Sequence, residues 1–414
     1  MRSRVFQGCS VLLLILLIQV GSGHPDTPIL SIDAITYFPD VTWTSTTPEE
    51  QGMNSTVLDE MMQFIEDVNA PIRGLVITRN GYIVKEDYWA YYTANTTHQI
   101  FSATKSFTGT LIGIALKEGF IDNVSQRVLD FFPEMTIENM DSRKGNMTIE
   151  HVLTMTTGLD WNEWNISYDD PSNMYQQMFN SPNPIQFFLN LPTVYDPGTH
   201  WVYTTGASHL LSAIITRATN MTSRQFAEQY LFAPLNATIG GWNVDHQGIN
   251  NGGTQLYVSA RTMAKLGLLY LNKGTWGGQE ILTEDYVAKA SSIQVITHLD
   301  DDYGYQWWID PVHDMFSAQG SEGQYIFVAP EYNIVFSIIA RADEPGEDIS
   351  GFILNFIANS ILEDATTAVT GTETNTTTGT TETAQFPITI ILASGVLIGV
   401  TLLAIFVYKS RYSK

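Results

Sequence analysis

A helix that is apolar on every side, with a serine and a lysine at its start, restricts the fold of this chain most. Residues 107–116 are almost wholly apolar, and Gly119 supplies a C-cap shortly afterwards. Because such a helix has no polar face for solvent, it must lie in the core. Ser102 and Lys105 stand three residues apart at its start, so their side chains share one face of the helix. The sequence therefore predicts a buried central helix that brings a hydroxyl and an amine together.

The Ser102 and Lys105 pair fits nucleophilic catalysis. A serine hydroxyl is a weak nucleophile until a neighbouring group accepts its proton. Lys105 would be poorly solvated on the first turn of a buried helix, which lowers its pKa and suits it as a base. The positive end of the helix dipole favours negative charge near Ser102. The alternative for so short a pattern is a serine N-cap followed by an ordinary surface lysine.

Two further segments carry residue types that fit this chemistry. Tyr203 lies on a loop before the apolar helix 210–215, from which its phenol could reach a neighbouring cleft and relay protons. Gly320 belongs to the glycine-rich stretch 317–324, ahead of a strand over 325–329. A glycine at a strand edge lets a substrate approach the backbone and allows an N–H to serve as an oxyanion donor.

Together these segments resemble the penicillin-recognising serine hydrolases, which include class C β-lactamases, D-alanyl-D-alanine carboxypeptidases, esterases and 6-aminohexanoate-dimer hydrolases. The likeness runs from about residue 45 to 363. It includes stretches without catalytic chemistry, at residues 151–161, 259–267 and 303–308. The resemblance implies that Ser102 is the acylated nucleophile and Lys105 its proton acceptor. It also implies that Tyr203, which matches the tyrosine of the Y-x-N motif, carries the proton to the leaving group.

Two positions depart from the family pattern. Thr205 stands where the family usually has asparagine, and residues 318–320 read Ala-Gln-Gly where many members carry lysine or histidine. Without that cation a substrate carboxylate is recognised more weakly, because charge-assisted hydrogen bonds are the strong ones. We therefore expect an ester or small amide as substrate, although Arg341 could supply the charge from a strand end.

The candidate binding residues lie close to these motifs. We expect the backbone N–H groups of Ser102 and Ser321 to form the oxyanion hole. The other candidates for substrate binding are Gly320, Gln319, Thr205 and Trp161. Two alternatives stay open: D-alanyl peptidase or β-lactamase activity, and a surface receptor or sensor that is acylated without turnover.

Other chemistries find little support in the sequence. No G-x-S-x-G motif is present, which disfavours an α/β-hydrolase. The eight histidines show no metal-ligand spacing, and Cys9 is the single cysteine. His151 and His209 fall on apolar helical segments, which favours structural roles. We expect neither a metal nor another cofactor.

The ends of the chain predict export and anchoring. Residues 1–23 combine arginines, a short apolar run and small residues, the pattern of a signal peptide. Residues 386–408 carry no charge and as a helix would span about 34 Å, enough for a bilayer core of about 30 Å. The basic tail 409–414 fits the positive-inside rule. We expect a single-pass protein of the cell membrane with its catalytic domain outside the cell.

The composition of the chain also fits a location outside the cell. Residues 364–385 are rich in threonine and should form an extended stalk. N-x-S/T sequons, which suggest a glycoprotein, begin at Asn54, Asn95, Asn123, Asn146, Asn165, Asn220, Asn236 and Asn375. The net charge of −23 repels nucleic acid, so we expect a small molecule or short peptide as the partner. The sequence leaves the oligomeric state open.

The remaining residues, 24–363, predict an α/β (α+β) domain. Two β runs meet at an Asn-Gly pair within 75–85, and a second hairpin covers 324–340, before a helix over 348–362. The simplest packing joins these strands in one antiparallel sheet with helices on both faces. A mainly helical lobe would occupy about residues 125–300, with the cleft between lobe and sheet. This is the β-lactamase/transpeptidase-like fold that the resemblance implies.

Overall fold

A seven-stranded antiparallel sheet forms the centre of the structure, with strand order β2-β1-β12-β11-β10-β9-β8. Its strands are β1 (Ile72–Arg79), β2 (Tyr82–Tyr88), β8 (Asp302–Tyr303), β9 (Trp308–Asp310), β10 (Met315–Gly320), β11 (Gln324–Ala329) and β12 (Ile334–Ala340). Strands from the two ends of the domain pair directly in this sheet, where Ile77 of β1 lies opposite Phe336 of β12. The prediction that the terminal strands share one sheet is confirmed.

The computed structural model describes residues 37–39, 43–341 and 350–362. The chain divides into two units, Met1–Ala365 and Thr366–Lys414, and all described residues belong to the first. The expected signal peptide, stalk, membrane helix and basic tail lie outside the described residues. Within the described residues, no helix combines the length and apolar character needed to cross a membrane.

Both predicted hairpins are present. The turn between β1 and β2 places Asn80 at φ 53° and Gly81 at φ 87°. Positive φ at both central residues is the requirement of a type I′ hairpin turn, and the Asn-Gly pair satisfies it. Strands β11 and β12 are joined by the short 3-10 helix η5 (Pro330–Tyr332).

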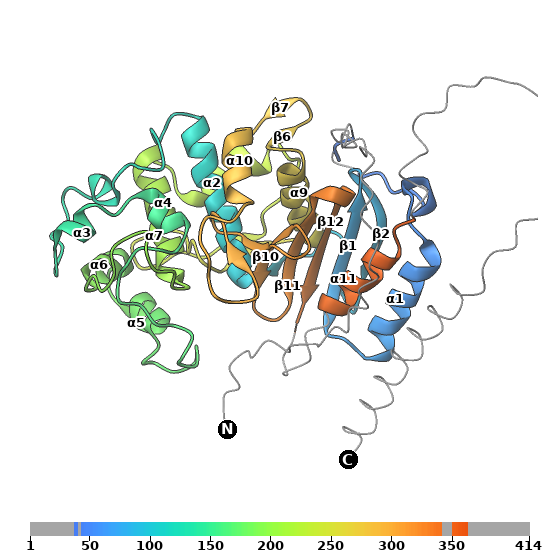
Figure 1. Cartoon of the computed structure of the whole chain (residues 1–414), viewed down its shortest axis with the longest axis horizontal. Coiled ribbons are helices and arrows are strands. Elements are labelled where there is room, and N and C mark those ends of the chain that lie inside the picture. The colour runs from blue at the N-terminus through green and yellow to red at the C-terminus, as the bar shows by residue number, and fades with distance from the viewer. Residues whose placement is uncertain (1–36, 40–42, 342–349, 363–414) are drawn as a thin grey trace, which may run out of the picture. The chain divides into compact units, whose positions relative to one another are not determined.

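Alternate residues of the sheet face two separate cores, as the pleat requires. Leu75 and Ile77 pack with helices α1 (Ser55–Asp67) and α11 (Ser350–Asn359), which lie against one face (Figure 1). Val76, between them, belongs to the larger core on the other face.

Helix α9 (Ala260–Leu271) covers that second face and packs against β1, β11 and β12. A Cβ on Gly267 of this helix would lie 2.5 Å from Val335 Cγ1, so the glycine permits the close approach of helix and sheet. Helix α9 lies within the range 125–300, and the structure places it on the sheet.

The predicted central helix is α2 (Thr104–Lys117), which follows the 3-10 turn η2 (Phe101–Ala103). Its residues from Thr104 to Ala115 are all buried, which confirms the expected core position. The helix ends at Lys117, Glu118 is the next residue, and Gly119 follows with φ 76°, the left-handed conformation of a glycine C-cap.

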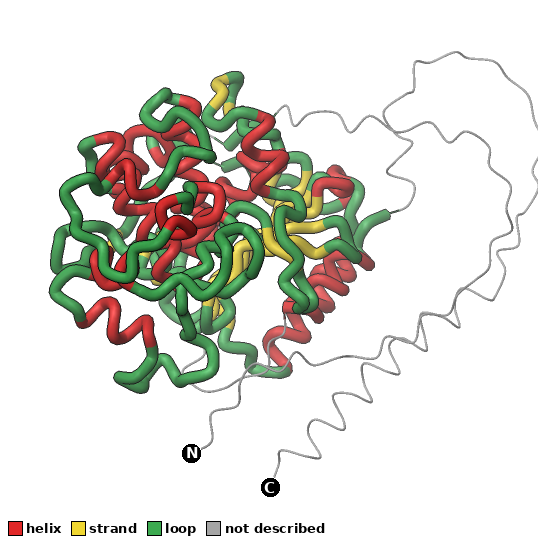
Figure 2. Tube along the Cα trace, turned by 60° about the vertical axis from the view of Figure 1, so that its left-hand side comes forward, coloured by secondary structure: helices red, strands yellow, loops and turns green. Residues whose placement is uncertain are grey.

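The mainly helical part lies to one side of the strands, as Figure 2 shows. Its helices are α3 (Ser142–Gly145), α4 (Ile149–Leu153), α5 (Met174–Asn180), α6 (Pro184–Asn190), α7 (Thr205–Thr219) and α8 (Ser223–Ala227). Helix α7 packs on α2 and α4. The predicted fold class, an antiparallel sheet with helices on both faces and a helical lobe, is confirmed.

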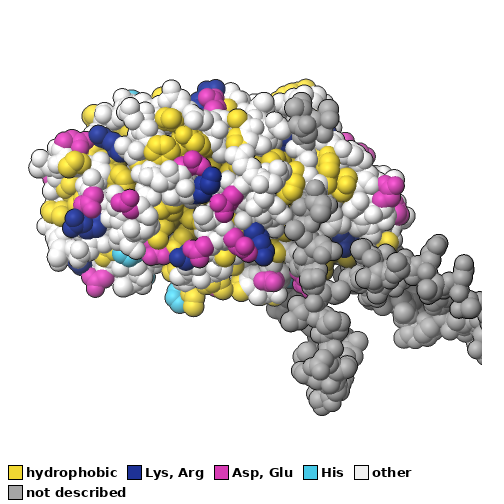
Figure 3. All heavy atoms as spheres, turned by 90° about the horizontal axis from the view of Figure 1, so that it is seen from above, with side chains coloured by type: hydrophobic (Ala, Val, Ile, Leu, Met, Phe, Trp, Pro, Cys, Tyr) yellow, Lys and Arg dark blue, Asp and Glu magenta, His cyan; other side chains and the backbone are white. Residues whose placement is uncertain are grey.

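The remaining elements are short. Two small sheets are formed by β3 (His98–Gln99), β5 (Leu256–Val258) and β4 (Gly241–Trp242), and by β6 (Thr275–Trp276) and β7 (Gln279–Glu280). The other helical pieces are η1 (Glu49–Gln51), η3 (Val128–Phe131), η4 (Glu228–Phe232) and α10 (Glu284–Ala290). On the face shown in Figure 3, basic side chains lie among acidic ones and do not form a basic field.

Candidate active site

Ser102 lies in the tight turn that leads into α2. Its neighbour Phe101 has φ 45°, an uncommon conformation for a residue with a side chain. Ser102 is partly exposed, whereas Ala103 and the first turn of α2 are buried. The turn therefore presents a hydroxyl at the surface of an otherwise buried helix start.

Lys105 reaches the hydroxyl of Ser102 from one turn along the chain. Its Nζ lies 3.0 Å from Ser102 Oγ and 2.9 Å from the carbonyl oxygen of Gly253. The side chain is 2% exposed, and burial lowers the pKa of Lys105 to about 8, while the Glu163 carboxylate opposes this shift. A neutral amine can donate to Gly253 and accept the proton of Ser102. The geometry therefore suits a base.

Tyr203 enters the same site from the loop before α7. Lys105 Nζ lies 4.8 Å from the centre of its ring. Burial raises the pKa of Tyr203, the charge of Glu163 raises it further, and a hydrogen bond with Ser102 lowers it. The structure thus brings together the three residues that the sequence singled out as nucleophile, base and proton carrier.

Two tryptophans hold the ring of Tyr203 in place. Trp164 stacks on it at 4.9 Å between ring centres, and Trp308 of β9 at 5.9 Å. Trp201 contacts both tryptophans edge to face. Stacked aromatic rings add stabilisation beyond the area that they bury, so the phenol has a well-defined position.

Glu163 is a member of this site that sequence reasoning missed. It is 1% exposed, and its carboxylate affects the pKa of both Lys105 and Tyr203. A signal was available in the sequence, because Glu163 stands between Trp161 and Trp164 near the motifs. An acidic residue among tryptophans is a candidate for a buried, hydrogen-bonded charge.

Two predicted substrate-binding residues contact this carboxylate. Thr205 donates to it from both its backbone N–H and its hydroxyl, at 2.9 Å and 2.8 Å. Trp161 donates from its indole Nε1 at 2.9 Å. Both are buried, so their polar groups are used inside the protein.

The third motif lies at the end of β10, against the turn that carries Ser102. A Cβ on Gly320 would lie 2.3 Å from the carbonyl oxygen of Ile100, so only glycine fits this approach. Ser321 follows on an exposed turn, where Glu322 and Gly323 have positive φ. The close approach of Gly320 sets the end of β10 against the turn before α2, and Ser321, the predicted oxyanion donor, is the next residue of the chain.

Gln319 faces a carboxylate. Its amide donates to Asp301 and to Ser317, both at 2.9 Å. Burial raises the pKa of Asp301. Ala318 is buried, and Arg341 donates to the hydroxyl of Tyr91. This wall of the site, formed by Gln319 and Asp301, therefore presents an amide and a carboxylate.

The registers of three neighbouring strands show that this wall adjoins Tyr203. Ser317 of β10 lies opposite Trp308 of β9, and Trp308 lies opposite Tyr303 of β8. Because side chains two residues apart share a face, Gln319 and Asp301 lie on the same face as Trp308. Trp308 stacks on Tyr203, so the wall of Gln319 and Asp301 lies beside the proposed catalytic residues.

His209 and His151, for which the sequence favoured structural roles, both make contacts within the fold. His209 is fully buried, and its Nε2 lies 2.9 Å from Asp245 Oδ2. His151 forms a capping box with Thr148 at the start of α4. Among the residues with described positions, no cluster of three His, Cys, Asp or Glu is arranged to hold a metal ion.

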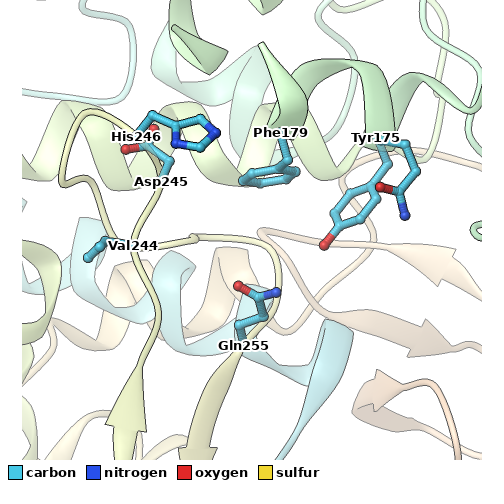
Figure 4. Close-up of a pocket in the computed structure, with 7 residues that line it drawn as sticks. Tyr175, Phe179, Val244, Asp245, His246 and Gln255 are labelled. Carbon is cyan, nitrogen blue, oxygen red and sulfur yellow. The ribbon is translucent and has the colours of Figure 1, made fainter. Parts of the chain in front are cut away.

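A pocket of about 340 Å³ lies on the lobe (Figure 4). Tyr175 and Phe179 point into it from α5 toward Gln255. Val244, Asp245 and His246 complete its lining together with Gln176. None of the predicted catalytic residues contributes to this lining, so the pocket carries no argument about the chemistry.

Comparison with known proteins adds independent findings. The family model described as Beta-lactamase matches residues 59–359. The 6-aminohexanoate-dimer hydrolase of Paenarthrobacter ureafaciens is 25% identical over 346 residues, which cover 78% of this chain and 80% of that protein.

Solved structures share the fold. A family VIII carboxylesterase superposes with a TM-score of 0.62 at 14% identity, covering 77% of this chain and 98% of the other. The octameric penicillin-binding protein homologue from Pyrococcus abyssi superposes with a TM-score of 0.59 at 18% identity, covering 75% and 78%.

Proposed function

This chain belongs to the beta-lactamase family, as its motifs suggested, and from this premise we propose that its hydrolase activity proceeds through an acyl-enzyme on Ser102. The single observation that supports this most is the contact between Lys105 Nζ and Ser102 Oγ at 3.0 Å, with the amine buried. A buried amine beside a partly exposed hydroxyl is the arrangement that activates a serine.

The two titratable partners of Ser102 divide the proton chemistry between them. Burial lowers the pKa of Lys105 to about 8, so a minority of the amine is already neutral near neutral pH and most of it is neutral above pH 8. Burial raises the pKa of Tyr203, so its phenol keeps its proton. Groups whose environments push their pKa values apart take the roles of base and acid. Lys105 is then the base, and Tyr203 the donor to the leaving group.

The reaction follows from these roles. Lys105 takes the Ser102 proton as Oγ bonds to the carbonyl carbon, and the N–H groups of Ser102 and Ser321 hold the resulting oxyanion. The bond to the leaving group breaks as Tyr203 supplies a proton, which the Lys105 ammonium replaces. Water then attacks the acyl group, releases the acid and restores the serine.

Labelling of the serine tests this mechanism. We expect Ser102→Ala to abolish covalent labelling by a fluorophosphonate with little change in the thermal melt. Ser142→Ala, at an exposed serine, is the matched control and should label as the wild type does. Labelling that persists in Ser102→Ala would place the nucleophile elsewhere. Labelling without turnover of any substrate would favour an acylated sensor over a hydrolase.

For the substrate we propose an ester or small amide without a carboxylate beside the scissile bond. Support comes from the wall of Gln319 and Asp301, because a carboxylate there disfavours a second negative charge. Relatives include a carboxylesterase and a 6-aminohexanoate-dimer hydrolase. We expect a higher kcat/KM for p-nitrophenyl acyl esters than for nitrocefin. Faster turnover of nitrocefin would overturn this assignment in favour of β-lactamase activity.

We also propose that the enzyme is exported and held on the outer face of the cell membrane. The sequence patterns of residues 1–23 and 386–414 support this proposal. Exposure of six sequon asparagines is compatible with glycosylation in that location: Asn95, Asn123, Asn146, Asn165, Asn220 and Asn236. A shift in electrophoretic mobility after glycosidase treatment of the native protein would test their modification, and an unchanged mobility would contradict it.

A further inference from the structure

We propose that Glu163 is a positioning residue of this site, which fixes the start of α7, and with it Tyr203, and which supplies the negative charge that faces Lys105. The proposal rests on the proposed function, because it takes Lys105 as the base and Tyr203 as the proton donor.

The side chain of Glu163 accepts hydrogen bonds from four donors. Oε2 accepts from Trp161 Nε1 and from the backbone N–H of Thr205, both at 2.9 Å. Oε1 accepts from the hydroxyls of Thr205 and Tyr168, both at 2.8 Å. Four donors around a side chain that is 1% exposed suit an ionised carboxylate, which only accepts hydrogen bonds.

These bonds fix where α7 begins. The N-cap residue Thr204 does not cap the helix with its side chain, because its hydroxyl donates to the carbonyl of Val202. The free N–H of Thr205 is satisfied instead by Glu163, 42 residues earlier in the chain. A negative charge is also favourable at the positive end of a helix. Since Tyr203 lies two residues before Thr205, the position of its phenol depends on this contact.

The charge of Glu163 acts on five titratable groups. It raises the pKa of each of these side chains: Lys105, Tyr168, Tyr175, Tyr203 and Tyr303. The four tyrosines all have raised pKa values and stay neutral near neutral pH. Lys105 is the member of this set that titrates near pH 8, so loss of the charge changes the ionisation of Lys105 first.

Glutamine can replace Glu163 without losing its partners. The two donors on Oε2 are N–H groups, which need an acceptor, and the glutamine carbonyl provides one. The two donors on Oε1 are hydroxyls, which can turn and accept from the glutamine NH₂ group. Glu163→Gln therefore removes the charge and keeps the hydrogen-bonded shape, whereas Glu163→Asp keeps the charge and withdraws it by one methylene.

The experiment measures the rate of fluorophosphonate labelling of the full chain against pH. In the wild type we expect the rate to rise with a midpoint near pH 8, where Lys105 loses its proton. In Glu163→Gln the midpoint should fall by about one pH unit, because an opposite charge no longer stabilises the ammonium. In Glu163→Asp the midpoint of the pH profile should equal that of the wild type. The plateau of the labelling rate at high pH should fall by about tenfold, since α7 and Tyr203 are held less well.

Glu150→Gln is the matched control. Glu150 accepts a hydrogen bond from Tyr305 and does not act on the pKa of Lys105, so its replacement should leave the midpoint in place. An unchanged midpoint in a cooperatively melting Glu163→Gln variant would overturn the electrostatic role. If Glu163→Gln does not fold, Glu163→Asp provides the test. A plateau labelling rate in Glu163→Asp equal to that of the wild type would overturn the positioning role.

Failure of this proposal is distinguishable from failure of the proposed function. If Ser102→Ala labels as well as the wild type, the acyl-enzyme mechanism fails, and with it the premise for Glu163. If Ser102→Ala is not labelled and Glu163→Gln keeps the wild-type midpoint, only the inference about Glu163 is overturned.

Discussion

Lys105 and Tyr203 illustrate how burial acts in opposite directions on a base and on an acid. Removal from water disfavours the charged form of either side chain, which lowers the pKa of the amine and raises that of the phenol. Burial in the same site therefore favours the neutral form of both side chains. Their positions depend on different parts of the chain, since Lys105 lies on α2 and Tyr203 is held by Trp164 and Trp308.

At the scale of single residues we predict the pH dependence of ester hydrolysis. Below about pH 8 Lys105 is protonated and cannot accept the proton of Ser102, so kcat/KM should fall as the pH drops through this value. The measurement is a pH profile of kcat/KM with a p-nitrophenyl ester. Lys105→Ala should lower kcat/KM by about 10²-fold or more and remove this step. A variant with wild-type rates would exclude Lys105 from the mechanism.

The wall formed by β8, β9 and β10 shows how strand pairing sets the surroundings of the third motif. Its register aligns Gln319 and Asp301 beside Trp308, and Gly320 lets the end of β10 reach the turn before α2. Strand β10 thus carries Gln319 and leads into Ser321, the candidate oxyanion donor. The charge of this wall follows from strand pairing, which no local pattern in the sequence reveals.

At the scale of elements we predict a stability effect at the start of α1. Asn54 Oδ1 accepts from the backbone N–H groups of Thr56 and Val57 and caps this helix. Asn54→Ala should lower the free energy of unfolding by about 1 kcal/mol, measured by urea denaturation. Asn54→Asp keeps an acceptor for the cap and, like alanine, removes the sequon, so it should retain stability. Equal losses in both variants would contradict the capping role.

The whole molecule is strongly acidic, with a net charge of −23. On the face in Figure 3 acidic and basic side chains are interspersed, so the excess of acidic residues does not gather there as one field. Ion pairs such as Arg261 with Glu86 and Arg217 with Glu134 join elements that are distant in sequence. A negative surface of this kind supports solubility and disfavours polyanionic partners.

At the scale of the whole molecule we predict that the C-terminal segment controls where the enzyme is found. Truncation after Glu363 should move the protein from the membrane fraction to the medium, because it removes the apolar stretch 386–408. Ester hydrolysis should persist, since the proposed catalytic residues all precede this point. The full chain should resist extraction by alkaline carbonate. Retention of the truncated protein in the membrane fraction would contradict the proposed anchor.

The sequence by itself determined the features that depend on local periodicity and spacing. The apolar run predicted the buried helix α2, the Asn-Gly pair predicted the first hairpin, and three-residue spacing predicted the contact of Ser102 with Lys105. These predictions succeed because helical and β periods, turn conformations and helix faces are properties of a few consecutive residues.

Only the tertiary structure decided the surroundings of those residues. It placed Glu163 against Thr205, joined Gln319 to Asp301, and set α9 on the sheet rather than among the lobe helices. Each of these contacts links residues that are far apart in sequence, and their pairing depends on how helices and strands pack. The physical reason is that burial and charge are shared between distant segments, whereas local patterns specify only which face of each segment is apolar.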